Sequence, residues 1–320
     1  MLPRQFEFFV QFTVQPTRWP DVRLRAYLPP GPVRANVVLL HDLGADSLSL
    51  AAFATHWAEH GYRVLTPDLP GHGATAASLP RGCRDFSELV EALLAGSYRP
   101  SSANAMAPEA FAAEPGSIPQ FVGGLGWGAS AALNVAAGAG GAGLSGLLMI
   151  EPVLAEIPAM LRPTARAAVG HAQRLESAEA VLAAWRLDWL LGALPVNLPV
   201  VHSSSAHALA ALPYRFYRPF SRGPNGLERT FWCECPVLAM LPRASACIDV
   251  ERAATQLESF GTSFEVRRFE SGETELAEFA LSVAAWSDDI LLNPVREAPQ
   301  PIYPPGLPSH PSHRKPTWIG

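Results

Sequence analysis

Short apolar runs alternate with amphipathic stretches along most of the chain. Residues 37–40 form a continuous apolar run, which is typical of a strand buried on both faces. Residues 50–60 place apolar side chains on one helical face and end before Gly61, and a further strand-like run follows at residues 62–66. This repeating order of strand, helix and strand predicts a largely parallel sheet with right-handed crossovers.

The same pattern predicts the other elements. Residues 6–14 and 22–27 are rich in β-branched and aromatic residues and flank a Pro-containing turn, which predicts an antiparallel hairpin. Further helices are expected at residues 85–94, 129–137 and 275–291, and further strands at residues 121–123, 147–150, 236–241 and 264–269. Residues 96–120 are dense in Pro, Ser and Ala and predict an excursion over the surface.

These elements predict one α/β domain that carries an insertion. Residues 1–151 would form the first part of the core and residues 231–295 the remainder. Residues 152–230 contain helical stretches without strand alternation, so we expect a helical lid inserted between the two parts. Residues 296–320 form a Pro-rich tail that favours extended structure, either as a disordered end or as an arm that docks a partner.

The charge balance limits the kinds of partner and chemistry. A net charge of -5 gives no basic field for a nucleic acid backbone. The only lysine is Lys315, which excludes a phosphate-binding loop with its lysine and a Schiff-base lysine within the fold. The pattern therefore predicts no cofactor and no nucleic acid partner.

The cysteine pattern predicts reduced thiols in an intracellular protein. The 4 cysteines lie far apart except for Cys233 and Cys235, which lack the second ligand pair of a zinc site. No secretory signal is visible at the N-terminus, so we expect a cytoplasmic or mitochondrial location. Residues 121–150 lack formal charges but are rich in Ala and Gly, which predicts buried strand, helix and strand rather than a membrane span.

Three local motifs carry a resemblance to a known family. They are VVLLHDLGAD at residues 37–46, YRVLTPDLPGHG at residues 62–73 and FVGGLGWGAS at residues 121–130. Together with the order of elements, they resemble the α/β-hydrolase family over roughly residues 22–291. The resemblance implies the α/β-hydrolase fold, in which a mostly parallel, doubly wound sheet carries an inserted helical lid. The third motif is similar to the nucleophile elbow of that family.

The residue at the elbow differs from the one that the family's chemistry needs. Leu125 and Trp127 flank Gly126, and Gly126 matches the position of the nucleophile. A glycine has no side chain with which to attack, and residues 121–129 contain no Ser, Cys, Thr, Asp or Glu. We therefore expect no catalytic residue at this position.

The positions that match the other members of the catalytic triad also differ. Ser245 matches the position of the acid, and Glu273 matches that of the histidine. Residues 208–309 contain no histidine at all, so the loss does not depend on the alignment. Asp249 and Glu151 are the carboxylates nearest to places where an acid could stand, and we interpret Glu151 as a cap or salt-bridge residue.

The loop that resembles the family's oxyanion loop is also altered. It has His41, Asp42 and Leu43 where the family has His-Gly, and an aspartate there would repel an oxyanion. No metal site is expected, because the histidines of the first half resemble structural positions of the family.

These losses lead to two hypotheses of function. The first is a catalytically inactive pseudo-hydrolase that acts as a binding or scaffold subunit, with other proteins as partners and a small apolar ligand under the lid. The alternative is an active serine hydrolase, similar to esterases and lipases, with a relocated triad. In that case a nucleophile among residues 203–205, between His202 and His207, stays open.

Overall fold

A computed structural model gives the fold of the chain. It describes residues 2–12, 19, 21–42, 45–70, 72–75, 86–101, 118–136, 143–152, 233, 235–243, 250–258, 264–269 and 273–293. The predicted lid beyond residue 152 and the predicted Pro-rich tail lie outside these residues. The domain boundaries therefore stay predictions.

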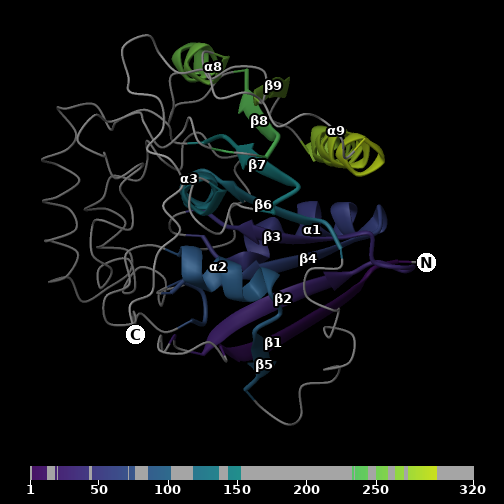
Figure 1. The fold of residues 1–320 in the computed structure, drawn as a ribbon, viewed down its shortest axis with the longest axis vertical. Helices are drawn as coiled ribbons and strands as arrows, with labels where there is room; N and C mark the ends of the chain where they lie inside the picture. Colours follow the sequence, from purple (N-terminus) through teal and green to yellow (C-terminus); the bar gives the residue numbers. More distant parts are fainter. Residues whose placement is uncertain are drawn as a thin grey trace, which may run out of the picture.

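A nine-stranded sheet forms the centre of the molecule, in the order β5-β1-β2-β4-β3-β6-β7-β8-β9 (Figure 1). Its strands are β1 (Arg4–Phe12), β2 (Val22–Leu28), β3 (Ala35–Leu40), β4 (Tyr62–Pro67), β5 (Tyr98–Pro100), β6 (Gln120–Leu125), β7 (Gly146–Ile150), β8 (Val237–Pro242) and β9 (Phe264–Phe269). From β4 to β9 all neighbouring strands pair in parallel, whereas β1 pairs antiparallel with β2 and with β5. The predicted hairpin and the predicted parallel sheet are confirmed.

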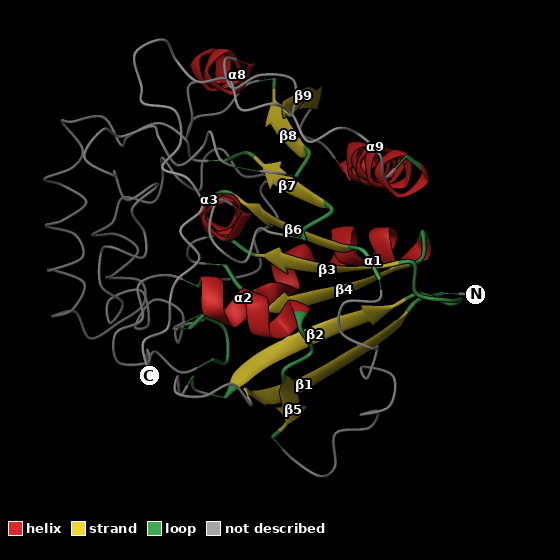
Figure 2. Ribbon diagram, in the orientation of Figure 1, coloured by secondary structure: helices red, strands yellow, loops and turns green. Residues whose placement is uncertain are grey.

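Helices cover both faces of this sheet (Figure 2). They are the 3-10 helix η1 (Ser47–Leu50) and the α-helices α1 (Ala51–Glu59), α2 (Ser87–Leu94), α3 (Trp127–Ala136), α8 (Val250–Glu258) and α9 (Glu273–Leu292). Apolar residues of α1 and α9 pack into one core cluster, and those of α2, α3 and α8 pack into the other. Each central strand therefore loses water on both faces, which explains its continuous apolar sequence.

Spacing of apolar residues accounts for the packing of the helices. In α1 the residues Phe53, Ala54, Trp57 and Ala58 are buried, and they share one helical face because they are separated by three or four positions. Trp286 of α9 reaches the same layer, where its ring stands edge-on to Phe121 at 6.0 Å between centroids. Burial of such aromatic side chains is worth about 1.5–3 kcal/mol each.

Two elements differ from the sequence-based expectation. Strand β5 lies within the predicted surface excursion and adds to the edge of the sheet beside β1. It is three residues long and ends in Pro100, so that its sequence carries no strand pattern. Helix α8 was not predicted, but it lies between the parallel strands β8 and β9, which need a crossover connection.

The arrangement of strands brings several carboxyl ends together. Strands β4, β3, β6 and β7 are consecutive in the sheet, and parallel strands end at the same edge. Leu40 is paired with Gly124, and Leu125 with Ile150, so that the residues following these strands are neighbours. This edge is where open α/β sheets bind their ligands.

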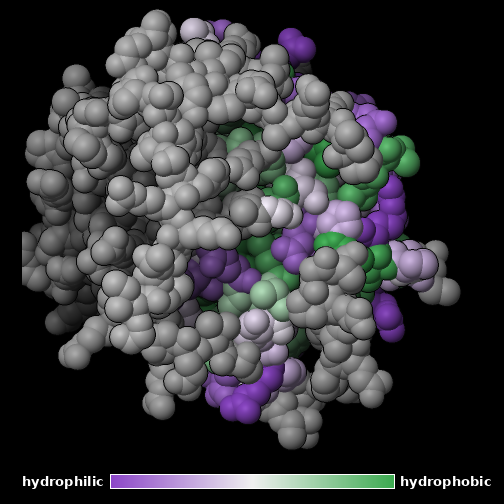
Figure 3. Space-filling model, in the orientation of Figure 1, coloured by the Kyte–Doolittle hydropathy of each residue, from purple (hydrophilic) through white to green (hydrophobic). Residues whose placement is uncertain are grey.

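The described helices do not combine the length and apolarity that a membrane span needs. None of these helices is both long and apolar enough to cross a membrane. On the face drawn in Figure 3, hydrophilic and hydrophobic residues of the described part of the chain are interspersed. The apolar run at residues 121–150 is the strand β6, the helix α3 and the strand β7 with the connection between them, as predicted.

Candidate active site

A sharp turn joins β6 to α3 at the carboxyl edge of the sheet. Gly126 occupies this turn with a φ of 56°, in the left-handed region that glycine enters without strain. Its backbone N–H donates to the carbonyl oxygen of Ile150 at 2.9 Å, which ties the turn to the end of β7. Ser130 lies in the next turn of α3 and is buried, with 3% exposed.

Close backbone contacts around the turn require small residues. A Cβ atom on Gly124 would lie 2.2 Å from the carbonyl carbon of Gly128. A Cβ atom on Gly128 would in turn lie 2.4 Å from the carbonyl oxygen of Leu40. The first turn of α3 is therefore pressed against the ends of β3 and β6. This is the strained strand-to-helix geometry that the elbow motif predicts.

The carboxylate of Asp42 fills the space above Gly126. A Cβ atom on Gly126 would lie 2.3 Å from Oδ1 and 2.5 Å from Oδ2 of Asp42. Asp42 follows β3, which pairs with β6, and is 6% exposed. The turn lacks a side chain of its own, but a carboxylate from the neighbouring strand stands where that side chain would begin. The sequence predicted only that Asp42 would repel an oxyanion.

His41 is a structural residue that fixes the backbone beside this carboxylate. Its Nε2 accepts the backbone N–H of Leu69 at 2.9 Å, and its Nδ1 lies 2.7 Å from the carbonyl oxygen of Asp42. These contacts fit the neutral tautomer in which Nδ1–H donates to Asp42. Burial lowers the pKa of His41, in agreement with a neutral ring. Both ring nitrogens are occupied, so His41 has no free position with which to take a substrate proton.

His72 lies next to His41 in the turn after β4. The two ring centroids are 5.0 Å apart. Burial, and then the neighbouring His41, lower the pKa of His72 to about 3. Its Nδ1 lies 3.3 Å from the carbonyl oxygen of Pro70, and its Nε2 has no hydrogen-bond partner within the described residues. The imidazole is therefore neutral at physiological pH.

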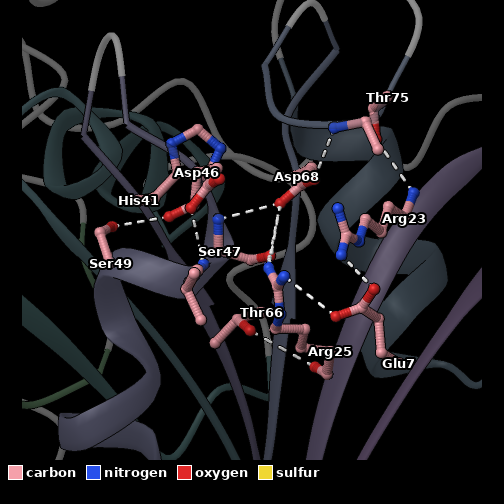
Figure 4. A network of polar contacts seen from close by, with 12 residues as sticks. Glu7, Arg23, Arg25, His41, Asp46, Ser47, Ser49, Thr66, Asp68 and Thr75 are labelled. Carbon is pink, nitrogen blue, oxygen red and sulfur yellow. Dashed lines mark hydrogen bonds and ion pairs between the residues drawn. The ribbon is translucent and has the colours of Figure 1, made fainter. Parts of the chain in front are cut away.

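A buried polar network around Asp68 supports the loops of the site (Figure 4). Asp68 is fully buried and accepts hydrogen bonds from the backbone and hydroxyl of Ser47 and from the backbone N–H of Ala74. The guanidinium of Arg25 donates to the Ser47 hydroxyl at 2.6 Å and forms an ion pair with Glu7 at 3.0 Å. The network joins the turn after β4 to η1 and to the strands β1 and β2.

Glu151 lies on the other side of the elbow, directly after β7. It has a φ of 47°, the only left-handed backbone of a residue other than glycine in the described part of the chain. Its side chain is buried, with 8% exposed, and its backbone N–H donates to Met240 at 2.8 Å. Strained backbone of this kind costs about 1–3 kcal/mol and often marks functional sites. Asp42 and Glu151 thus follow the two strands that flank β6, and of the two carboxylates only that of Asp42 is seen to contact the space above Gly126.

Of the other positions singled out in the sequence, the structure describes Leu125 and Trp127 beside the elbow and the backbone of Glu273. Ser245 and Leu43 lie outside the described residues. Glu273 is the first residue of α9, and its side chain is not described. Leu125 ends β6 in a half-buried position, and Trp127 begins α3. Within the described part of the chain, no group of three or more His, Cys, Asp or Glu side chains could hold a metal ion.

The two cysteines of the described residues are buried. Cys233 and Cys235 precede β8 and are both buried without a disulfide. Burial raises the pKa of the Cys233 thiol well above its usual range, so that the reactive thiolate is not formed at neutral pH. Cys233 is therefore excluded as a relocated nucleophile.

Comparisons with solved structures agree with this fold. A lipase in an open form aligns over 90% of this chain and 99% of its own, with a TM-score of 0.58 and 18% identity. MenH from S. aureus aligns over 84% and 98%, with a TM-score of 0.59 and 16% identity. Monoglyceride lipase from Saccharomyces cerevisiae aligns over 87% and 96%, with a TM-score of 0.55 and 18% identity. Comparison with curated protein sequences finds no match.

The fold and the elbow define the chain as an α/β-hydrolase, as the sequence motifs predicted. The model of the serine aminopeptidase family S33 matches residues 31–196, more than half of the 320 residues. The chain therefore belongs to the serine aminopeptidase S33 family.

The prediction of an inactive scaffold protein is wrong. The chain belongs to a hydrolase family, and the structures that resemble it include lipases and esterases, which favours the alternative of an active hydrolase. That prediction took the lack of a side chain at Gly126 to mean that no reactive group stands at the elbow. The structure places the Asp42 carboxylate in that space, so the absence of a side chain at residue 126 does not leave the elbow without a functional group.

Proposed function

We propose that the protein is a hydrolase of carboxylic esters or amides, with catalytic groups that are relocated from the usual triad positions. The observation that carries the proposal is the Asp42 carboxylate in the nucleophile space of an otherwise intact elbow. Membership of a serine aminopeptidase family supports hydrolysis of an acyl bond. The lipases and esterases that share the fold point to ester substrates as the first to test.

The groups around the elbow suit this chemistry. The N-terminus of α3 presents backbone N–H groups without helical partners, and its dipole favours negative charge on a substrate oxygen. Asp42 supplies a group that can accept a proton beside the same turn. A bond-polarising end and a proton acceptor are the two functions that acyl hydrolysis requires.

The location and the substrate size belong to the same proposal. An intracellular location is supported by Cys233 and Cys235, which are both free thiols. A substrate with a small apolar acyl group would suit a site under the helical lid that the sequence predicts at residues 152–230. These residues lie almost wholly outside the described part of the chain.

A panel of chromogenic substrates tests the proposal. It consists of p-nitrophenyl esters with short and long acyl chains and of aminoacyl p-nitroanilides, which report ester and amide hydrolysis separately. We expect turnover of at least one class well above the spontaneous rate. Absence of turnover of every substrate between pH 6 and pH 9 would contradict the proposal.

A further inference from the structure

We propose that Asp42 is the general base of this hydrolysis, and that it activates a water molecule for direct attack without a covalent enzyme intermediate. The inference rests on the proposed function and specifies how the reaction takes place. It assigns a catalytic role to a residue that lies outside the three positions of the usual triad.

The position of the carboxylate is the first argument. Both oxygens of Asp42 lie within 2.5 Å of where a Cβ atom of residue 126 would stand. A side chain at residue 126 would extend from this point toward the substrate, so the carboxylate and such a side chain would occupy the same space. Asp42 is buried, with 6% of the residue exposed.

The backbone around Asp42 holds that position. Leu69 donates to His41, and His41 lies within hydrogen-bond distance of the carbonyl oxygen of Asp42. The first turn of α3 approaches from the other side, because a Cβ atom on Gly128 would lie 2.5 Å from the carbonyl oxygen of His41. His41 is therefore a positioning residue, and Asp42 is held from the loop after β4 and from α3.

The leaving groups of acyl hydrolysis favour Asp42 as a general base rather than as a nucleophile. If an oxygen of Asp42 attacked the carbonyl carbon, the tetrahedral intermediate would carry a carboxylate and an alkoxide or amine as competing leaving groups. An aspartate has a reference pKa of about 3.9, far below that of an alcohol or a protonated amine, so the carboxylate would leave first and the step would reverse. Attack by water avoids this problem, because the hydroxyl that it adds is retained in the product.

The proposed reaction consumes one water molecule and regenerates Asp42. The water oxygen forms a bond to the carbonyl carbon while one water proton moves to an oxygen of Asp42, and the carbonyl oxygen becomes an oxyanion. The intermediate then collapses, the bond to the leaving oxygen or nitrogen breaks, and the proton of Asp42 passes to that leaving atom. Asp42 returns to its carboxylate form, and no other reactant is consumed.

This order of events also removes the electrostatic objection to an aspartate in this loop. A carboxylate next to an oxyanion would raise the energy of the transition state. When Asp42 takes the proton of water, its charge is neutralised as the oxyanion forms. The N–H groups at the start of α3 then face a single developing negative charge.

Substitution of Asp42 is the first part of the test. Asp42→Asn keeps the size of the side chain but removes the base, and general-base catalysis typically contributes about 100- to 10,000-fold. We expect kcat to fall by at least about 100-fold. Asp46→Asn is the matched control: Asp46 is also buried, and it caps η1 through its side chain, which asparagine can also do. A D42N protein that unfolds like wild type and keeps its full rate would overturn the inference.

The second part uses the wild-type protein in water enriched in oxygen-18. With enzyme in excess over a p-nitrophenyl ester, direct attack places one heavy oxygen in the acid product of the first turnover and none in the protein. An unlabelled first product with label appearing in the peptide that contains Asp42 would identify a covalent aspartyl intermediate and overturn the inference.

A fluorophosphonate probe separates this inference from the proposed function. We expect no labelling of the active protein, because no nucleophilic serine takes part. Labelling of a serine together with ester turnover would support a hydrolase and overturn the role of Asp42. Failure of the wild type to hydrolyse any substrate would overturn both.

Discussion

The carboxylate of Asp42 occupies the space in which a side chain at residue 126 would begin. Oδ1 of Asp42 lies 2.3 Å from the position of a Cβ atom on Gly126, closer than any real contact allows. Glycine at residue 126 and aspartate at residue 42 therefore form a matched pair. The altered oxyanion loop and the altered elbow therefore meet at one point of the structure.

The pair predicts a non-additive effect on stability. Gly126→Ala would add about 1–2 kcal/mol of left-handed backbone strain and would also displace the Asp42 carboxylate. In the background of Asp42→Ala, only the strain remains. Denaturant unfolding of the two single variants and the double variant should give a coupling energy of about 1 kcal/mol or more.

Gly143→Ala provides the control for this cycle. Gly143 also has a positive φ, of 100°, but no atom lies within 4 Å of its would-be Cβ. Its substitution should show strain and no coupling to Asp42→Ala. Strict additivity of Gly126→Ala and Asp42→Ala would show that the two positions do not share the same space.

Removal of the Asp68 carboxylate should strongly destabilise the fold. Asp68→Ala would leave the donors of Ser47 and Ala74 without their acceptor and would leave the guanidinium of Arg25 largely buried beside a cavity. The Arg25 guanidinium lies 3.9 Å from a carboxylate oxygen of Asp68, and loss of one partner of a buried charge pair typically costs about 3–5 kcal/mol. Denaturant unfolding of the variant measures this loss directly.

An exposed ion pair serves as the comparison. Glu251 on α8 pairs with Arg268 at 3.2 Å, but its side chain is 86% exposed. Glu251→Gln should change the free energy of unfolding by less than about 0.5 kcal/mol. A loss for Asp68→Ala as small as that for Glu251→Gln would contradict the structural role of the network.

The buried histidines predict an acid-sensitive fold. The pKa of His72 is lowered from 6.5 to about 3, so between these values the unfolded chain binds a proton that the folded chain does not. Stability should therefore fall as pH decreases from 6.5 toward 3, by up to about 1.4 kcal/mol per pH unit for this group. The lowered pKa of His41 acts in the same direction.

A histidine substitution measures this effect. The slope of unfolding free energy against pH below 6.5 should be shallower in His72→Gln than in wild type, by up to one proton. An equal slope in His72→Gln and wild type would show that His72 is protonated in the folded protein.

Local sequence patterns were sufficient to predict most of the fold. Apolar runs such as residues 37–40 and helical spacing such as that of α1 depend on neighbouring residues, and both elements formed as expected. Strand β5 escaped prediction because its three residues gain their place only by pairing with β1. Edge strands of this length depend on tertiary contacts rather than on their own sequence.

The site was harder to predict because it depends on distances between separate strands. The sequence showed that Gly126 has no nucleophile and that Asp42 replaces a glycine, and treated these as independent losses. Only the pairing of β3 with β6 brings the two residues to the same point. The two residues lie in motifs about 80 positions apart, and a single sequence does not show which distant positions are in contact.

The most direct test of the central claim is the rate at which the purified protein hydrolyses p-nitrophenyl esters and aminoacyl p-nitroanilides, measured against temperature beside its unfolding curve. A hydrolase whose activity depends on its own elbow should act well above the spontaneous rate and should lose activity over the same temperatures at which it unfolds. Absence of activity, or activity that persists after the protein has unfolded, would contradict the claim.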